Sequence, residues 1–281
     1  MDFARDVKRF NISLHKEEAK IYDVVRREEI FNKFEQRRQW GKLLNVASEC
    51  LSTKHCLDLG CGTGNLIVKE AMLFDYVIGL DISREMINVL KGKIRGMMRK
   101  KSDFIVADCE NLPFRSNVFD LVSISSVLHH LPSVYVALKE AYRVLLAHGV
   151  IFMDHEPNAM ARKAIFKLLK RLLIRIKLLT KFSSRDPDTI YAFRLFRSLD
   201  HTKTDVLGES GFHPKAIKRM LHHIGFYPVT IDFHFILFSE LSMLPKPLDQ
   251  ISMIDNLLDA TPLIKKMADT ITIISKKEGS S

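Results

Sequence analysis

The sequence predicts an α/β protein built around a parallel β-sheet. Short apolar runs alternate with amphipathic stretches of about 10–15 residues between positions 55 and 154, which is the pattern of successive βαβ units. A glycine-rich turn follows the first apolar run, and an aspartate ends each of the next two. At 281 residues, the chain is long enough for a sizeable core in one large domain or two small ones.

Each element follows from its local pattern. Helices are expected over the first fifty residues, where apolar side chains recur at three- and four-residue spacing among many charges. The apolar runs then predict strands at residues 55–59, 76–80, 104–107, 119–125, 150–154, 229–235 and 270–275. Helices are expected at residues 66–73, 83–98, 134–146 and 214–223, with a helical insertion at residues 251–267. Asn65 and Ser83 are suited to cap the first two of these helices.

The composition narrows the class of protein. With 47% hydrophobic and 27% charged residues, the chain is neither disordered nor fibrous. No apolar stretch approaches the roughly 18 residues of a membrane-spanning helix, and the first ten residues lack the apolar core of a secretory signal. A cytoplasmic protein is therefore expected. Its four cysteines show no CxxC spacing and are expected to be reduced: Cys50, Cys56, Cys61 and Cys109.

The glycine-rich turn after the first predicted strand favours a nucleotide-like ligand, because glycine lets the backbone approach such a ligand closely. Its spacing is G-x-G-x-G, and Asn65 stands where a dinucleotide-binding loop needs its third glycine. No P-loop pattern is present either. Asp58 precedes the turn, and its carboxylate suits a ligand with an ammonium group better than a pyrophosphate.

Two further aspartates follow the second and third predicted strands. Asp81 is placed to accept hydrogen bonds from both ribose hydroxyls, and Asp108 from an adenine amino group. Ile82 and Leu112 are placed to sandwich the base. Because the carboxyl ends of parallel strands meet at one crevice, we expect these aspartates to converge there with Asp58.

The chain resembles the class I S-adenosylmethionine-dependent methyltransferases in five ordered motifs: LDLGCGTGN, GLDIS, ADCENLPF, FDLVSISSVLHHL and EAYRVLLAHG. Within them it is similar to the small-molecule branch of ubiquinone/menaquinone-type enzymes. The resemblance covers residues 50–156 well and implies S-adenosylmethionine as cofactor. It also implies a doubly wound, Rossmann-like sheet of seven strands in the order 3-2-1-4-5-7-6, with strand 7 antiparallel. One departure, Ala147-His148-Gly149 in place of Pro-Gly-Gly, concerns a turn.

The resemblance also assigns site residues and domains. It implies that the methionine moiety lies on Gly60, Cys61, Gly62 and Gly64, the ribose on Asp81, and the adenine on Asp108 and Cys109, with Ser125 lining the pocket. Tyr22 and Asp23 fall where this branch often places a helix that closes over the cofactor. The expected divisions are a helical cap (1–50), the cofactor-binding core (51–156), a basic helical insertion (157–212) and the rest of the sheet (213–281).

Methyl transfer needs a positioned acceptor and, for a hydroxyl or carbon acid, a general base. Candidates are His129 and His130 after the fourth strand, and His155 and Glu156 after the fifth. A structural role for the histidine pair, with one ring packed and one bonded to backbone, stays open. No metal is expected, because neither a His-x3-His nor an HExxH spacing occurs.

Residues 159–185 contain nine lysines and arginines and no acid, with an apolar stripe at helical spacing. This segment fits a lid helix with a solvated basic face, a helix lying on an anionic membrane surface, or a binding surface for nucleic acid. The N-P-P-[YF] signature of amino-methylating nucleic-acid enzymes is absent.

The sequence therefore predicts a methyltransferase for a small, apolar or aromatic acceptor, such as a quinone- or lipid-like molecule. The apolar stripe of the basic segment and residues 233–238 (FHFILF) motivate this choice of acceptor. An RNA methyltransferase and a non-catalytic cofactor-binding partner protein remain alternatives. The methylated atom and the oligomeric state stay open.

Overall fold

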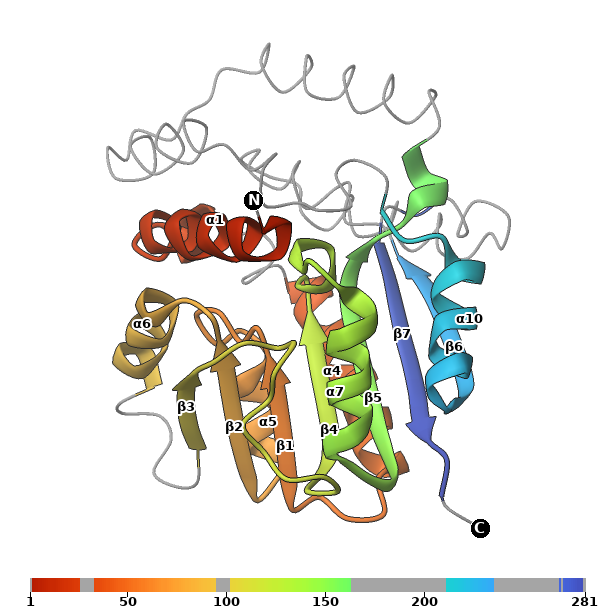
Figure 1. The fold of residues 1–281 in the computed structure, drawn as a ribbon. Coiled ribbons are helices and arrows are strands. Elements are labelled where there is room, and N and C mark those ends of the chain that lie inside the picture. Colours follow the sequence, from red (N-terminus) through yellow and green to blue (C-terminus); the bar gives the residue numbers. More distant parts are fainter. Residues whose placement is uncertain are drawn as a thin grey trace.

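The computed structural model describes residues 2–25, 33–94, 102–162, 211–234, 268 and 270–279. Its centre is a seven-stranded sheet in the order β3-β2-β1-β4-β5-β7-β6 (Figure 1). The strands are β1 (His55–Leu59), β2 (Tyr76–Asp81), β3 (Ser102–Val106), β4 (Phe119–Ser125), β5 (Leu145–Pro157), β6 (Phe226–His234) and β7 (Thr270–Lys277). Strands β1 to β5 are parallel, and β7 runs antiparallel between β5 and β6. The predicted fold class and strand order are confirmed.

Helices cover both faces of this sheet, and one lies across its upper edge (Figure 1). They are α1 (Phe3–Glu18), α2 (Tyr22–Val25), α4 (Lys33–Glu49), α5 (Ile67–Leu73), α6 (Arg84–Ile94), α7 (Val134–Val144) and α10 (Pro214–Ile224), with the 3₁₀ turns η1 (Leu128–His130) and η2 (Ala159–Arg162). Helices α4, α5 and α6 pack on one face, and α7 and α10 pack on the other. Helix α1 crosses the carboxyl ends of the parallel strands (Figure 1).

The continuous apolar runs of the sequence reflect burial on both faces of the sheet. In β4, Val122 and Ile124 belong to the core beneath α7, whereas Leu121, the residue before Val122, belongs to the core beneath α4. The same alternation places Ile151 and Phe152 of β5 in opposite cores. A strand that buries both faces needs apolar side chains at successive positions, which is why no polar alternation marks it.

Some predicted boundaries differ from the structure. Strand β5 begins at Leu145, five residues before its predicted start, because Leu145 pairs with Phe119 ahead of a register shift in β4. Asn65 is not a cap: α5 begins at Ile67, and the Asn65 side chain instead accepts from Gln36 and Lys69. The cap expected at Ser83 is present, since its Oγ accepts from the Met86 N–H at 3.3 Å.

Several sequence predictions lie outside the described residues. These are most of the basic segment, from residue 163 to 185, the helical insertion at 251–267, and the last four residues of the helix predicted to end at 98. Within the described ranges, no helix combines the length and apolar character needed to cross a membrane.

Candidate active site

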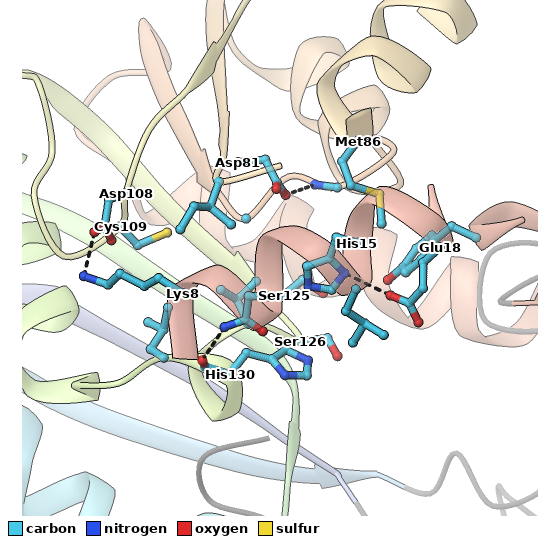
Figure 2. A pocket seen from close by; sticks show the side chains of 18 of the residues that line it. Lys8, His15, Glu18, Asp81, Met86, Asp108, Cys109, Ser125, Ser126 and His130 are labelled. Carbon is cyan, nitrogen blue, oxygen red and sulfur yellow. Dashed lines mark hydrogen bonds and ion pairs between the residues drawn. The ribbon is translucent and has the colours of Figure 1, made fainter. Parts of the chain in front are cut away.

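Two adjoining cavities lie at the carboxyl ends of the parallel strands, beneath α1. The larger encloses about 910 Å³ of empty space, counting open solvent at its mouth, which is within the range of small-molecule sites. Its lining comes from α1, the turn after β1, the ends of β2 and β4, and the segments that follow β3 and β4 (Figure 2). Five residues line both cavities: Tyr22, Gly60, Gly62, Ser125 and Ser126.

The turn after β1 has the backbone conformation that glycine favours. Gly60, Gly62 and Gly64 have φ values of 70°, 51° and 93°, in the left-handed region. A Cβ atom on Gly60 would lie 2.3 Å from Val127 Cγ2, and one on Gly64 would lie 2.2 Å from Leu90 Cδ1. A Cβ on Gly62 would meet nothing within 4 Å. Gly62 therefore faces open space in the cavity, whereas Gly60 and Gly64 fit closely against neighbouring side chains.

This contrast gives a stability prediction. Gly60→Ala and Gly62→Ala both incur about 1–2 kcal/mol of left-handed strain. Gly60→Ala must also displace Val127, which we expect to add roughly 1 kcal/mol to its loss of unfolding free energy. Urea unfolding of the two variants measures the difference. Equal losses would contradict the close packing of Gly60 against Val127.

Asp81, the last residue of β2, is hydrogen-bonded to the turn after β1. Its Oδ2 accepts from the Gly62 N–H at 2.9 Å, and its Oδ1 accepts from the Ser83 N–H at 2.8 Å. Burial raises the pKa of Asp81, and His15 together with these backbone donors partly offsets the increase. The carboxylate therefore shapes the cavity floor as well as lining it.

Asp58 lies under the smaller cavity with an unsatisfied oxygen. The residue is 1% exposed, and its Oδ2 has no hydrogen-bond partner among the described residues. Burial, Glu70 and Asp81 raise the pKa of Asp58 well above its usual value. Glu70 is fully buried behind it, and burial raises the pKa of Glu70 to about 7. A ligand ammonium group would supply the missing donor and favour the charged form of Asp58.

The third aspartate, Asp108, forms an ion pair with Lys8, a residue that sequence reasoning missed. Lys8 Nζ lies 2.6 Å from Asp108 Oδ2 and 2.5 Å from Glu110 Oε2, which joins α1 to the segment after β3. Cys109 and Ile82 also line the larger cavity, but Leu112 and Gly64 are not among the residues lining either cavity. Asp81, Asp108 and Ile82 thus line the larger cavity and Asp58 the adjoining smaller one, whereas Leu112 lines neither.

Helix α2 is held against the glycine turn. Asp23 accepts from Thr63 Oγ1 at 2.6 Å and lies 2.7 Å from Lys93 Nζ. Tyr22, one residue before it, lines both cavities. This placement agrees with the expectation that Tyr22 and Asp23 lie beside the ligand site.

The four candidate bases separate into two groups. His130 lines the larger cavity and His155 the smaller. Glu156 lines neither: it is fully buried, and its Oε1 accepts from the N–H groups of Val127 and Leu128 at 2.9 and 3.0 Å. Its Oε2 lies 2.9 Å from His129 Nδ1, and His129 also lines neither cavity. Glu156 therefore holds the η1 turn in place, with His129 as one of its partners.

His155 belongs to a buried ion-pair network that joins α4 to β5 and β7. Its Nε2 lies 2.8 Å from Glu35 Oε1, and its Nδ1 lies 2.9 Å from Asp154 Oδ2. Arg38 binds both carboxylates, at 2.6 Å from Glu35 and 2.9 Å from Asp154. Thr272 of β7 donates to Asp154 at 2.6 Å. Burial lowers the pKa of His155, but the two carboxylates outweigh it and raise that pKa to about 10.

The charges of this network balance without a metal ion. Single ligand atoms of Glu35, His155 and His234 lie within 4.8 Å of one another, a spacing that a metal could bridge. However, the Arg38 guanidinium and a protonated His155 already match the charges of Glu35 and Asp154. Burial and Arg38 lower the pKa of His234 to about 3, so it is neutral beside them. We therefore describe the cluster as an ion-pair network.

This network predicts how stability depends on pH. A pKa raised from 6.5 to about 10 means that His155 stabilises the fold fully below pH 6.5, and that its contribution is lost as pH rises toward 10. Asparagine in place of His155 tolerates the observed φ of 56°, but its side chain does not titrate. We expect the variant to lose less unfolding free energy than the parent between pH 6.5 and 10, as measured by urea unfolding. Parallel curves would contradict a protonated His155.

Comparison with known proteins identifies the family of the central part of the chain. Residues 57–153, from β1 to β5, match the family described as "Methyltransferase domain". Residues 57–153 are a methyltransferase domain. The sheet order and the motifs place it in class I, which uses S-adenosylmethionine as methyl donor.

Two curated relatives resemble the methyltransferase domain and its surroundings. A demethylmenaquinone methyltransferase of Staphylococcus saprophyticus is 31% identical over 148 residues, which cover 51% of this chain and 63% of that protein. One from Lactiplantibacillus plantarum is 37% identical over 112 residues, covering 38% and 47%. The chain thus spans less than two thirds of the length of these relatives. A solved S-adenosylmethionine-dependent methyltransferase of Thermotoga maritima shares the fold, with a TM-score of 0.53 at 14% identity over 94% of this chain and all of that one.

The residues of the methyltransferase domain fit its implied cofactor. The unsatisfied Asp58 oxygen offers an acceptor to an amino-acid ammonium, and the open space at Gly62 leaves room beside the backbone. The convergence of three carboxylates suits a ligand rich in N–H and O–H donors. Sequence reasoning missed the contribution of α1, whose residues Lys8, Asn11, His15 and Glu18 all line the larger cavity. Their three- and four-residue spacing is the signal that could have indicated one polar face of a helix.

Proposed function

We propose that this protein methylates a small aromatic hydroxy compound of the quinol type, with S-adenosylmethionine as donor. Asp58, Asp81 and Asp108 at one edge of the sheet carry the cofactor part of the proposal. The names of the curated relatives, demethylmenaquinone methyltransferases, support the acceptor class. Apolar side chains in the described site support it further, since Leu14, Leu131 and Pro132 line the larger cavity.

In this proposal each residue has a separate part in binding. Asp58 accepts from the methionine ammonium, beside Gly60, Cys61 and Gly62. Asp81 accepts from the ribose hydroxyls, while Asp108 and Cys109 lie at the adenine end, and Ser125 lines the wall where the two cavities meet. Gly64 acts indirectly, through its close fit against Leu90. The cofactor, when bound, supplies a methyl group on a positively charged sulfur.

Catalysis then depends mainly on alignment. The nucleophilic atom of the acceptor must lie in line with the methyl–sulfur bond, and such alignment is worth roughly 7–11 kcal/mol. The residues shared by the two cavities mark the place for this alignment, because the methionine and adenosine parts would meet there. Helix α1 covers the cavity and would exclude water from the reacting atoms.

The proposal is tested in two steps. Calorimetry with S-adenosylhomocysteine should show one site per chain. Transfer of a labelled methyl group should then occur to reduced demethylmenaquinone and not to its oxidised form, which lacks the hydroxyl protons. Absence of cofactor binding would refute the enzyme assignment, whereas binding without transfer to the quinol would refute only the acceptor.

We further propose that residues 159–185 rest on an anionic membrane surface, where an apolar quinol would be found. Nine basic residues and an apolar stripe support this role, since each lysine or arginine near such a surface contributes about 1 kcal/mol. Sedimentation with vesicles containing anionic lipid, compared with neutral vesicles, tests it. Salt-sensitive retention of transfer RNA without vesicle binding would instead favour the RNA methyltransferase.

A further inference from the structure

Besides the buried network of His155 and Glu35, two histidine–glutamate pairs lie near the cavities, and they differ in one respect. His129 Nδ1 lies 2.9 Å from Glu156, and His15 Nδ1 lies 2.9 Å from Glu18 Oε2. Glu156 also accepts from two backbone N–H groups, and neither member of its pair lines a cavity. His15 and Glu18 both line the larger cavity. Of these two pairs, the one on α1 is thus placed where it could contact a ligand in the larger cavity.

The contact with Glu18 determines which nitrogen of His15 carries the proton. When the Glu18 carboxylate is ionised it can only accept, so the facing Nδ1 then donates. In a neutral imidazole this leaves Nε2 without a proton and able to accept one. A carboxylate that orients a histidine in this way is the arrangement found in general-base catalysis.

The neighbours of His15 in the larger cavity come from α1, β2 and η1. Both members of the pair project from the same face of α1, three residues apart, and Figure 2 shows their side chains directed toward each other. The His130 ring lies edge-on to His15, with 5.9 Å between ring centroids. Asp81 of β2 is close enough for His15 to affect its pKa. Among the residues that the structure describes, Glu18, His130 and Asp81 are thus charged or titratable groups that face His15.

The α1 helix is itself fixed over the cavity, so the pair has a defined position. Asn11, one turn before His15, donates to the His130 carbonyl at 2.9 Å. Lys8, a further turn away, is paired with Asp108 and Glu110. A base must be held within hydrogen-bond reach of the proton it removes, and these contacts provide that rigidity.

We propose that His15, oriented by Glu18, is the general base that removes the hydroxyl proton of the methyl acceptor. This rests on the proposed function, because it requires an acceptor with a phenol-type hydroxyl in the larger cavity. The hydroxyl proton moves to His15 Nε2, and the negative charge of the resulting phenolate is shared with the neighbouring ring carbon, which forms the bond to the methyl carbon. That ring carbon then loses its hydrogen as a proton, the aromatic ring is restored, and the oxygen regains a proton. The carbon–sulfur bond breaks with its electron pair remaining on sulfur, and His15 later releases the proton to solvent.

Three single variants test the proposal. His15→Gln should lower the single-turnover rate of methyl transfer to reduced demethylmenaquinone by about 10²–10⁴-fold, the usual contribution of a general base. Glu18→Gln should lower it less, since the imidazole remains. Glu17→Gln is the matched control: it makes the same change one residue away on the exposed face of α1 and should leave the rate unchanged. A general base acts only in its unprotonated form, so the rate of the parent should rise with pH. This rise should disappear in His15→Gln.

Affinity for S-adenosylhomocysteine separates catalysis from cofactor binding. Calorimetry should give values within about twofold of the parent for His15→Gln and Glu18→Gln, so that the loss lies in the chemical step. A loss of affinity as large as the loss of rate would overturn the proposal and make His15 a cofactor contact. An unchanged rate and pH profile in His15→Gln would overturn it as well.

A measurement without acceptor keeps the two proposals distinguishable. If the parent binds S-adenosylhomocysteine but does not methylate the quinol, the acceptor proposal fails, and the nitrogen NMR spectrum of the His15 ring still tests the pair. We expect the neutral ring to carry its proton on Nδ1 in the parent and to lose this preference in Glu18→Gln. A proton on Nε2 in the parent would overturn the role of His15 as base.

Discussion

Replacing Asp154 with alanine should destabilise the protein by about 3–5 kcal/mol, as expected when one partner of a buried ion pair is removed. Asp154 is fully buried and accepts from Arg38, Gln39 and Thr272 at 2.6–3.2 Å. Its loss leaves the Arg38 guanidinium in the interior with Glu35 as its remaining carboxylate partner in this network. Urea unfolding at pH 7 measures the change.

A surface ion pair provides the control for this prediction. Lys42 Nζ lies 2.6 Å from Asp232 Oδ2, but these side chains are 29% and 30% exposed. Lys42→Met should therefore change the unfolding free energy by no more than about 1 kcal/mol. If Asp154→Ala cost no more than Lys42→Met, the network would not be the link between α4, β5 and β7 that its geometry indicates.

Replacing Asp81 with asparagine should weaken binding of S-adenosylhomocysteine by about 10- to 100-fold, or about 1.4–3 kcal/mol. Both Asp81 oxygens already accept from backbone N–H groups. An amide would turn one acceptor into a donor facing another donor, and it would also remove the charge that the ribose hydroxyls would meet. Calorimetry at constant pH measures the effect.

Asp103→Asn is the matched control for Asp81→Asn. Asp103 is exposed on β3 and is hydrogen-bonded to the Tyr76 hydroxyl, from the residue at the start of β2. Its replacement should leave cofactor affinity unchanged. Melting temperatures recorded for both variants show whether a loss of affinity comes from a loss of fold. Unchanged affinity in a folded Asp81→Asn would remove this residue from the cofactor site.

The core of the fold follows directly from the sequence because its strands are buried on both faces. A run such as 119–125 then carries apolar side chains for both faces, at four of its seven positions, and it was predicted to the residue. The positions of Asp58, Asp81 and Asp108 could be predicted equally well. Each lies in or just after a strand near its carboxyl end, and the place of that strand in the sheet determines where the side chain lies. The start of β5 was missed because it depends on pairing with Phe119, which no local pattern reveals.

The roles of individual polar residues were harder to predict. Glu156 follows the strand predicted at residues 150–154, as a catalytic acid would, but whether it faces a substrate or the N–H group of Val127 depends on how the η1 turn folds. The docking of α1 is also a long-range result. Its buried apolar residues, Val7 and Leu14, show that it packs somewhere, but not that it packs over the cavity.

The position of β7 has a consequence for the order of folding. This strand follows β5 and β6 in the chain, yet it lies between them and pairs with both. During synthesis on the ribosome, the long apolar edge of β5 therefore has no neighbour until residue 270 and those after it emerge. Unpaired edges of this kind promote aggregation, and pairing across a long sequence separation is slow. A nascent chain stalled before β7 should consequently need a chaperone more than the finished protein does.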